Sequence, residues 1–160
     1  MIGTTARNTL VAATFVGGLL AGGNVDRAIV AMPAWQQVGV SSWADFSRHA
    51  DLGNGLVLYP LEAIGGALLL LSAIICFRFE RIGFERARVP LLAALALSLG
   101  GLALTLKAAP VMLGIEHTAG SAELMNAFRD FHFWGNIRAI FQIAAFAAEL
   151  WALAVLGPRV

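Results

Sequence analysis

The chain contains little charge and almost no cysteine. Charged residues make up 13% of its 160 residues and hydrophobic residues 59%, whereas a soluble domain is about a quarter charged. Eleven basic and ten acidic residues nearly cancel, which excludes the strongly basic surface of a nucleic-acid-binding protein. Cys76 is the single cysteine, so no internal disulfide can form. The excess of apolar over charged residues predicts an integral membrane protein whose main partner is the lipid bilayer.

Several motifs of enzyme and metal chemistry are also missing. The chain has no glycine-rich nucleotide loop, no serine nucleophile motif and neither HExxH nor CxxC. Its three histidines, His49, His117 and His132, lie near predicted loop–helix borders without the compact spacing of metal ligands. We therefore expect no cofactor. The alternative is a metal or haem held by these three histidines; a bound haem or copper would give the purified protein a visible colour.

Four apolar stretches are long enough to cross a bilayer, whose core of about 30 Å needs about 20 helical residues. They cover residues 9–32, 53–77, 90–112 and 132–156. The pattern predicts an all-α bundle of four transmembrane helices, up-down-up-down, in a single domain over residues 1–160. Arg7 followed by an apolar stretch also fits a signal peptide, but the apolar pattern resumes at Ala28, which favours a retained helix.

Arginines predict the orientation of the bundle. The connection over residues 78–88 holds four of them, which the positive-inside rule places in the cytoplasm together with both termini. We expect the membrane to be a bacterial inner membrane. In the first outer connection, Pro33 predicts a helix end at Met32, and Ser41 or Ser42 is expected to cap a short interfacial helix. Trp35 and Trp43 would then lie at the level of the lipid headgroups.

Paired glycines punctuate the first three apolar segments. Small residues let helix backbones approach closely within a membrane. These pairs therefore predict tight packing seams, and they would also permit homo-oligomers. The pairs are Gly17-Gly18, Gly22-Gly23, Gly65-Gly66 and Gly100-Gly101.

Each segment also carries a polar residue at a similar depth. At 1.5 Å per residue these side chains lie roughly 8 to 14 Å inside the predicted outer surface. They are Asn24, Glu62, Lys107 and Arg138, with Asn136 as a further neutral partner. Polar side chains that are confined to the outer half of a bundle predict a pocket that opens outward. The structural alternative is that Glu62 pairs with Arg138 or Lys107, or that Lys107 extends to the interface.

The last segment carries a polar stripe. Trp134, Arg138, Gln142 and Glu149 are separated by 4, 4 and 7 residues, which puts them on one helix face. An ionisable group at membrane depth commonly costs a few kcal/mol. The stripe should therefore face other helices or a wet cavity, although Glu149 could instead extend to the cytoplasmic surface.

These residue types suggest a chemistry. A guanidinium offers a fixed fork of donors and an ammonium a point charge, so Arg138 and Lys107 would suit a ligand with an anionic or enolate oxygen. His132 lies near this face and is the best candidate for a general acid or base. An ordinary interfacial histidine is the alternative.

The same residues carry a family resemblance. The run Phe131-His132-Phe133-Trp134-Gly135-Asn136-Ile137-Arg138, followed by Ala139-Ile140-Phe141-Gln142, resembles the closing helix of the anthrone-oxygenase-like membrane proteins. That four-helix family, also described as a domain of unknown function, has a W-x-N-x-x-R-type pattern, whereas this chain reads W-x-N-x-R. Gly22-Gly23-Asn24-Val25 and Met32-Pro33-Ala34-Trp35 are similar to the opening of those proteins.

The resemblance implies an oxidoreductase. Some fungal relatives oxidise an anthrone to an anthraquinone with molecular oxygen and no added cofactor. By this likeness His132 would be the base, Arg138 and Lys107 would stabilise the enolate, and Trp134 and Trp35 would stack on a lipophilic aromatic or quinone-like substrate. Asn24, Glu62, Asn136 and Gln142 would complete the ligand site. The alternative function is a non-enzymatic membrane protein that binds a small ligand or a partner subunit through the same pocket.

Overall fold

Four long helical rods make up the molecule, and the computed structural model describes residues 4–80 and 84–157. The first rod joins α1 (Thr4–Asp26), a π-helical turn η1 (Arg27–Ala31) and α2 (Met32–Val38). The second joins α3 (Val40–His49), a π-helical turn η2 (Ala50–Asn54) and α4 (Gly55–Glu80). The third is α5 (Phe84–Gly114) with a 3₁₀ turn (Ile115–His117), and the fourth is α6 (Ser121–Leu156). The predicted all-α bundle of four long apolar helices is confirmed.

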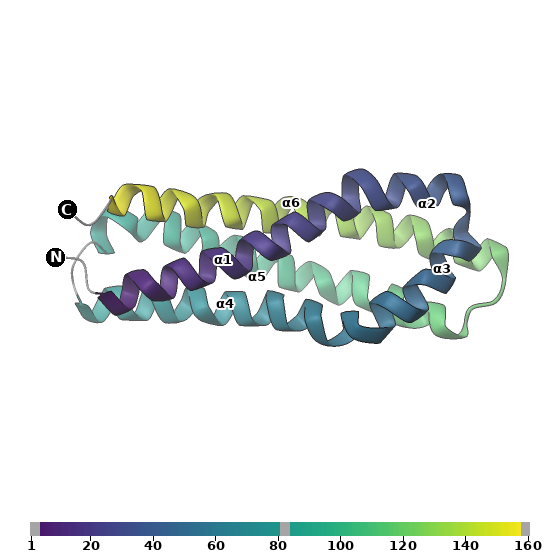
Figure 1. Ribbon diagram of the computed structural model, residues 1–160, viewed down its shortest axis with the longest axis horizontal. Coiled ribbons are helices and arrows are strands. Elements are labelled where there is room, and N and C mark those ends of the chain that lie inside the picture. The colour runs from purple at the N-terminus through teal and green to yellow at the C-terminus, as the bar shows by residue number, and fades with distance from the viewer. Residues whose placement is uncertain (1–3, 81–83, 158–160) are drawn as a thin grey trace.

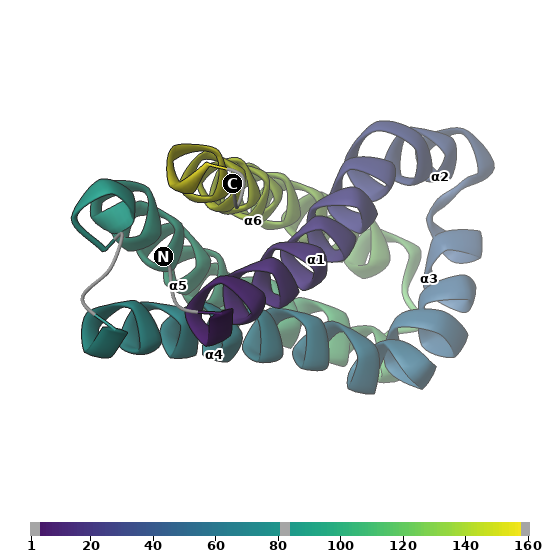
Figure 2. The same ribbon diagram turned by 60° about the vertical axis from the view of Figure 1, so that its left-hand side comes forward.

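The rods alternate in direction, so the bundle runs up-down-up-down (Figure 1). α1 packs against α4 and α6, while α5 packs against α6 and α4. In the turned view α1 crosses the bundle obliquely between α4 and α6 (Figure 2). Arg7 Nη1 donates a hydrogen bond of 2.9 Å to the Gly157 carbonyl, which ties the start of α1 to the end of α6. We call this the terminal end, and the opposite end, formed by α2 and α3, the loop end.

The rods are longer than the predicted spans. All four are long and apolar enough to cross a membrane. Large apolar side chains such as Phe15, Leu68, Leu106 and Ile140 cover the outside of the bundle, as expected for surfaces in contact with lipid. The 36 residues of α6 extend about 54 Å at 1.5 Å per residue, well beyond a hydrocarbon core of about 30 Å. The rods therefore continue outside the bilayer core.

Chain connections are correspondingly short. α4 reaches Glu80 and α5 begins at Phe84, so most of the predicted connection 78–88 is helical. Arg78, Arg86 and Arg88 lie on these helix ends. Arg81 of this arginine-rich connection lies outside the described residues.

The predicted helix end at Met32 is wrong. Met32 has α-helical dihedrals (φ −64°, ψ −42°), and Pro33 lies inside the first turn of α2. The preceding π-helical turn makes room for the proline. In this turn the Met32 N–H donates to the Arg27 carbonyl, five residues back. The chain therefore continues as a helix, whereas a regular i−4 pattern would bring a carbonyl against the proline ring. The chain turns instead at Gly39, whose φ of 110° is open to glycine.

α3 begins directly after this turn. It starts at Val40 after Gly39 and has no side-chain cap, so the predicted capping role of Ser41 or Ser42 is not found. Trp43 is 1% exposed and packs edge-on against Phe128 with ring centroids 5.2 Å apart. It is thus a core residue of the loop end rather than a lipid-facing anchor, because the kink at Gly53 between α3 and α4 folds α3 over α6.

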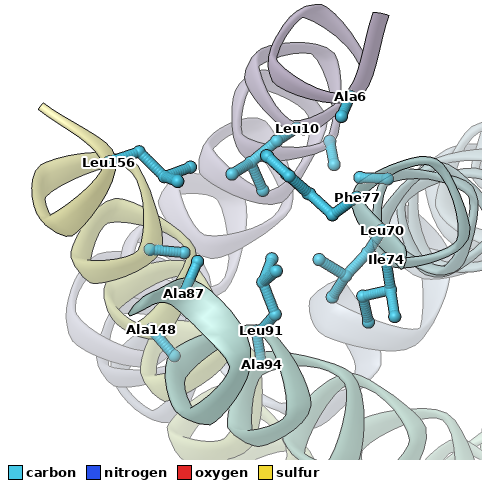
Figure 3. Packing of buried hydrophobic residues seen from close by; sticks show 13 residues of the cluster. Ala6, Leu10, Leu70, Ile74, Phe77, Ala87, Leu91, Ala94, Ala148 and Leu156 are labelled. Carbon is cyan, nitrogen blue, oxygen red and sulfur yellow. The ribbon is translucent and has the colours of Figure 1, made fainter. Parts of the chain in front are cut away.

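Two separate apolar cores hold the rods together. The terminal core joins α1, α4, α5 and α6, whose side chains meet in Figure 3; among its fully buried members are Leu10, Leu70, Phe77 and Leu91. The loop core joins Trp43 of α3 to α2, the end of α5 and the start of α6. Two buried polar residues, Asn24 of α1 and Gln142 of α6, lie between the two cores.

The glycine pairs fulfil the packing prediction only in part. A Cβ on Gly100 would lie 2.7 Å from the Phe141 ring, and one on Gly18 would lie 3.1 Å from the Phe146 ring. Both contacts bring α6 against a glycine backbone. Cβ atoms on Gly22, Gly23 and Gly65 would meet nothing within 4 Å. The close seams therefore run along α6, where its large aromatic side chains need room.

Candidate functional site

An amide pair lies near the middle of the bundle. Asn24 of α1 donates a 2.6 Å hydrogen bond from Nδ2 to Oε1 of Gln142 on α6, and it also donates to the Leu20 carbonyl. Both side chains are buried. A buried amide must be satisfied inside the protein, and this pair satisfies part of each group. The structure thus brings together two residues that the sequence placed on separate segments.

One turn towards the loop end, an arginine joins three elements. Arg27 forms an ion pair with buried Asp51 of η2, and its Nη2 donates to Tyr59 Oη of α4 at 3.0 Å. Its guanidinium also lies over two rings, 5.1 Å from the centroid of Tyr59 and 5.6 Å from that of Phe131. Ring faces attract a cation, most strongly away from water. Arg27 is therefore held in a fixed position, and its charge is matched by Asp51.

Arg138 faces the same region from α6. Its guanidinium lies within electrostatic range of Arg27, Asp51 and Tyr59. Nε of Arg138 is buried and has no hydrogen-bond partner among the described residues. Two cations and one carboxylate leave this group with one positive charge in excess. A buried donor without an acceptor costs about 1–3 kcal/mol, so an acceptor supplied by a ligand would be stabilised here. We call Arg27, Asp51, Tyr59 and Arg138 the arginine cluster.

Towards the terminal end, a small cavity lies below the amide pair. Residues of α1, α4, α5 and α6 line it, among them Gly17, Glu62, Ser98, Gln142 and Glu149. Its free volume of about 20 Å³ admits a water molecule but no aromatic ligand. Glu149 is 3% exposed, so its carboxylate faces the protein interior instead of reaching the membrane surface.

The predicted polar stripe on α6 accordingly faces inward. Gln142 and Glu149 are buried, while Trp134 and Arg138 are half-buried. Trp134 packs against the loop core and stacks edge-on with Phe133 at 5.1 Å. Trp35 also packs against the loop core and lies 5.1 Å from the Phe46 ring. We call these two tryptophans, together with Phe131, the aromatic layer; it borders the arginine cluster because Arg27 lies over the Phe131 ring.

Other predicted site residues lie elsewhere. Lys107 is exposed on α5, in the part of the bundle surface that would face lipid. His132 lies six residues before Arg138, which puts the two side chains about 120° apart around the helix, and it stacks on Phe128 at 6.1 Å. Asn136 is half-buried and two residues from Arg138, so it points along a different face. Among the described residues, neither of the ion pairs joins His132, Lys107 and Arg138 to one another.

The histidines are spread over three elements. His49 is exposed on α3, where its Nδ1 lies 2.8 Å from the Asp45 carbonyl. His117 is exposed in the 3₁₀ turn after α5, and His132 is half-buried on α6. Within residues 4–80 and 84–157, no group of three or more histidine, cysteine or acidic side chains comes close enough to hold a metal ion.

The predicted ion pair of Glu62 with Arg138 or Lys107 is not found among the described residues. Among the described residues, Arg27 pairs with Asp51 and Arg48 pairs with Asp45, and neither pair involves Glu62 or Arg138. The alternative in which Glu62 locks Arg138 or Lys107 is therefore not realised in this structure.

Sequence reasoning missed the part of the site built by Arg27, Asp51 and Tyr59. One signal was present: Arg27 follows Asn24 by three residues and so shares its helix face. No sequence pattern predicts that Asp51 pairs with Arg27, because its position beside Arg27 depends on the kink at Gly53. Tyr59 resembles an ordinary interfacial tyrosine until Arg27 is seen over its ring.

Comparisons with known proteins give no family assignment. No family model, no curated protein and no solved structure matches this chain.

Proposed function

We propose that this integral membrane protein binds a small lipophilic molecule bearing an anionic or strongly accepting oxygen, and that Arg138 is the group that receives that oxygen. The observation that carries the proposal is the buried Nε of Arg138, which has no partner among the described residues. Asp51 is already matched by Arg27. The excess positive charge of the arginine cluster is therefore available to a ligand. Charge-assisted hydrogen bonds are about twice as strong as neutral ones.

The aromatic layer supports the apolar part of the ligand. Phe131 and Trp134 precede Arg138 by seven and four residues, so all three lie along one side of α6. Binding sites in proteins commonly combine such aromatic walls with a few polar groups that fix orientation. A flat aromatic acid would place its ring along this layer and its oxygen at the guanidinium.

Two probes that differ only in charge test this proposal. Anthracene-9-carboxylate and the neutral anthracene-9-methanol are titrated by calorimetry into the purified protein in lipid nanodiscs. The wild type should prefer the carboxylate, and Arg138→Gln should lose that preference by about 10- to 100-fold, the equivalent of a charged hydrogen bond of about 1.5–3 kcal/mol. Lys107→Gln, which removes an exposed cation from α5, is the matched control and should bind like wild type. Unchanged carboxylate affinity in Arg138→Gln would overturn the proposal.

A second candidate is the oxygenase activity implied by the resemblance to anthrone-oxygenase-like proteins. It is favoured by one further observation: a carboxylate base, Asp51, lies in electrostatic range of the cation Arg138. In this proposal a base removes a proton from the methylene carbon of an anthrone, and Arg138 stabilises the resulting enolate oxygen. Molecular oxygen then oxidises that carbon to a carbonyl. Anthrone and one O₂ give anthraquinone and one water, so atoms and electrons balance.

The base in this reaction is open between two residues. The sequence favours His132, while the position of Asp51 within electrostatic range of Arg138 supports Asp51. Anthraquinone formation from anthrone is measured under oxygen and under nitrogen, with heat-denatured protein as background. Loss of turnover in Asp51→Asn but not in His132→Asn would assign Asp51, and the reverse would assign His132. No turnover above background in the wild type would leave the binding function without the chemistry.

We also propose that the terminal end faces the cytoplasm of a bacterial cell. Arg7, Arg78, Arg86 and Arg88 all lie at that end, in keeping with the positive-inside rule. A Cys76→Ser background carrying Ser41→Cys should react with an impermeant thiol reagent added outside spheroplasts. The same background carrying Glu85→Cys, an exposed position near the start of α5, would be protected. Reversed labelling would overturn the orientation and put the arginine cluster on the cytoplasmic side.

A further inference from the structure

Below the amide pair, a second feature of the bundle is not used by the proposed ligand site. Glu149 of α6 is 97% buried, and its Oε2 has no hydrogen-bond partner among the described residues. It faces the cavity that Glu62 of α4 also lines, together with Gln142 and Ser98. Two carboxyl groups thus share one small polar space in the middle of a membrane-spanning bundle.

The space beside Glu149 is made by a glycine. A Cβ on Gly17 of α1 would lie 2.6 Å from Oε2 of Glu149. Any larger residue at this position would push the carboxyl out of its place. The opening is large enough for one water molecule, since about 20 Å³ of free volume exceeds the roughly 10–15 Å³ that a water needs. A water here would have carboxyl, amide and hydroxyl groups as partners.

Charge around the cavity is unbalanced. On α4 the charged group that lines it is Glu62, while α1 contributes Gly17 and Leu20, and α5 contributes Ser98 and Leu102. No lysine or arginine is among the lining residues. Burying a carboxylate without a cation or a donor beside it is costly, and a proton removes that cost by neutralising the group. The cation that this cavity can admit must be no larger than a water molecule.

We propose that the cavity is a proton-binding site, in which Glu149 holds one exchangeable proton hydrogen-bonded to a water in the cavity. The site shares no residue with the arginine cluster, although Glu62 lies in electrostatic range of Tyr59. It requires no ligand of the arginine cluster, so it stands whether or not that cluster binds an aromatic acid.

Infrared spectroscopy of the protein in lipid bilayers tests the site directly. A protonated carboxyl gives a C=O stretching band that moves to lower frequency in D₂O, and ionised carboxylates give no such band. We expect this band in the wild type at neutral pH and its loss in Glu149→Gln, an isosteric change. Glu123→Gln, which alters an exposed acid at the start of α6, should leave the band unchanged. Identical spectra for the wild type and Glu149→Gln would overturn the proposal.

Two further measurements keep the result decisive. Gly17→Ala should retain the band but shift its frequency, because the added methyl group displaces the carboxyl; if Glu149→Gln fails to fold, an unshifted band in Gly17→Ala would contradict the proposal. Exchanging sodium for choline in the buffer should have no effect. A band that appears only when sodium is removed would identify the occupant as a metal cation and overturn the assignment of a proton.

Discussion

The terminal core and the loop core differ in the size of the side chains that fill them. Alanine is the commonest residue of the terminal core, so four helix backbones approach closely around a few leucines and Phe77. The loop core is filled by Trp43, Phe128 and Phe131 with two methionines. Large rings hold helices farther apart and present faces to which a cation can bind. The arginine cluster lies beside these rings, with Arg27 over Phe131.

The comparison shows where a small bundle can accommodate charge. In lipid, close packing of small residues takes the place of the hydrophobic effect between helices. That packing leaves no room for a guanidinium. An aromatic layer provides both the space and an attractive surface, which accounts for the location of the arginine cluster at its border.

The largest expected effect comes from removing the centre of the loop core. Trp43 is almost fully buried, and truncating such a residue to alanine typically costs about 3–5 kcal/mol. Trp43→Ala should therefore lower the free energy of unfolding by about that amount. Reversible unfolding in mixed detergent micelles, followed by far-ultraviolet circular dichroism, measures it. The matched control is Trp151→Ala, because Trp151 is 50% exposed and should lose less than half as much. Equal losses in the two variants would mean that the rings of the loop core do not hold this end together.

A smaller effect is expected where backbone and ring meet closely. The Cβ added by Gly100→Ala would lie 2.7 Å from two carbons of the Phe141 ring, and such overpacking typically costs about 1–3 kcal/mol. Gly65→Ala is the control, since its Cβ meets nothing within 4 Å; alanine there should stabilise the helix by up to about 1 kcal/mol. The same unfolding assay distinguishes the two signs. A stabilised Gly100→Ala would show that α5 and α6 are not in close contact at this position.

The smallest expected effect concerns the hydrogen bonds that join α3 to the end of the third rod. Arg48 of α3 donates to the carbonyls of Ile115 and Thr118, at 3.0 Å and 2.7 Å from Nη2. Arg48→Met keeps an unbranched side chain as far as the position of Nε but removes these bonds, so we expect a loss of about 1 kcal/mol, reduced from the usual charged-bond value by exposure. Hydrogen exchange should speed up in α3 and the 3₁₀ turn, with α4 unaffected. Arg129→Met, an exposed change on α6, should leave exchange in all of them unchanged.

The architecture was predictable because membrane helices must satisfy their own backbone. Four apolar stretches of sufficient length leave little choice but a helical bundle. The helix ends were harder to predict. Pro33 normally disfavours a helical residue before it, yet the π-helical turn at Arg27–Ala31 lets the helix continue to Val38. Sequence rules for breaks assume regular helices, and this irregularity defeats them.

The candidate site was predictable where it depends on helical periodicity alone. Arg138, Gln142 and Glu149 share a face of one regular helix, so their inward orientation followed from spacing. Lys107 shows the limit: its depth could be counted, but its direction depends on how α5 is rotated in the bundle, which leaves it exposed. Asp51 reaches Arg27 only through the kink at Gly53. Contacts between different rods therefore required the structure.

The π-helical turn that precedes α2 contains one residue more than a regular α-helical turn. A regular α-helix advances about 100° per residue, so everything after Arg27–Ala31 faces a direction set by that additional residue. Deleting a single residue there would change the composition of the rod hardly at all, but it would bring the regular i−4 pattern against the Pro33 ring. It would also rotate Met32 out of the loop core and turn Trp35 away from Phe46. The number of residues in this one turn, more than the side chains they carry, thus sets the direction in which the loop end faces.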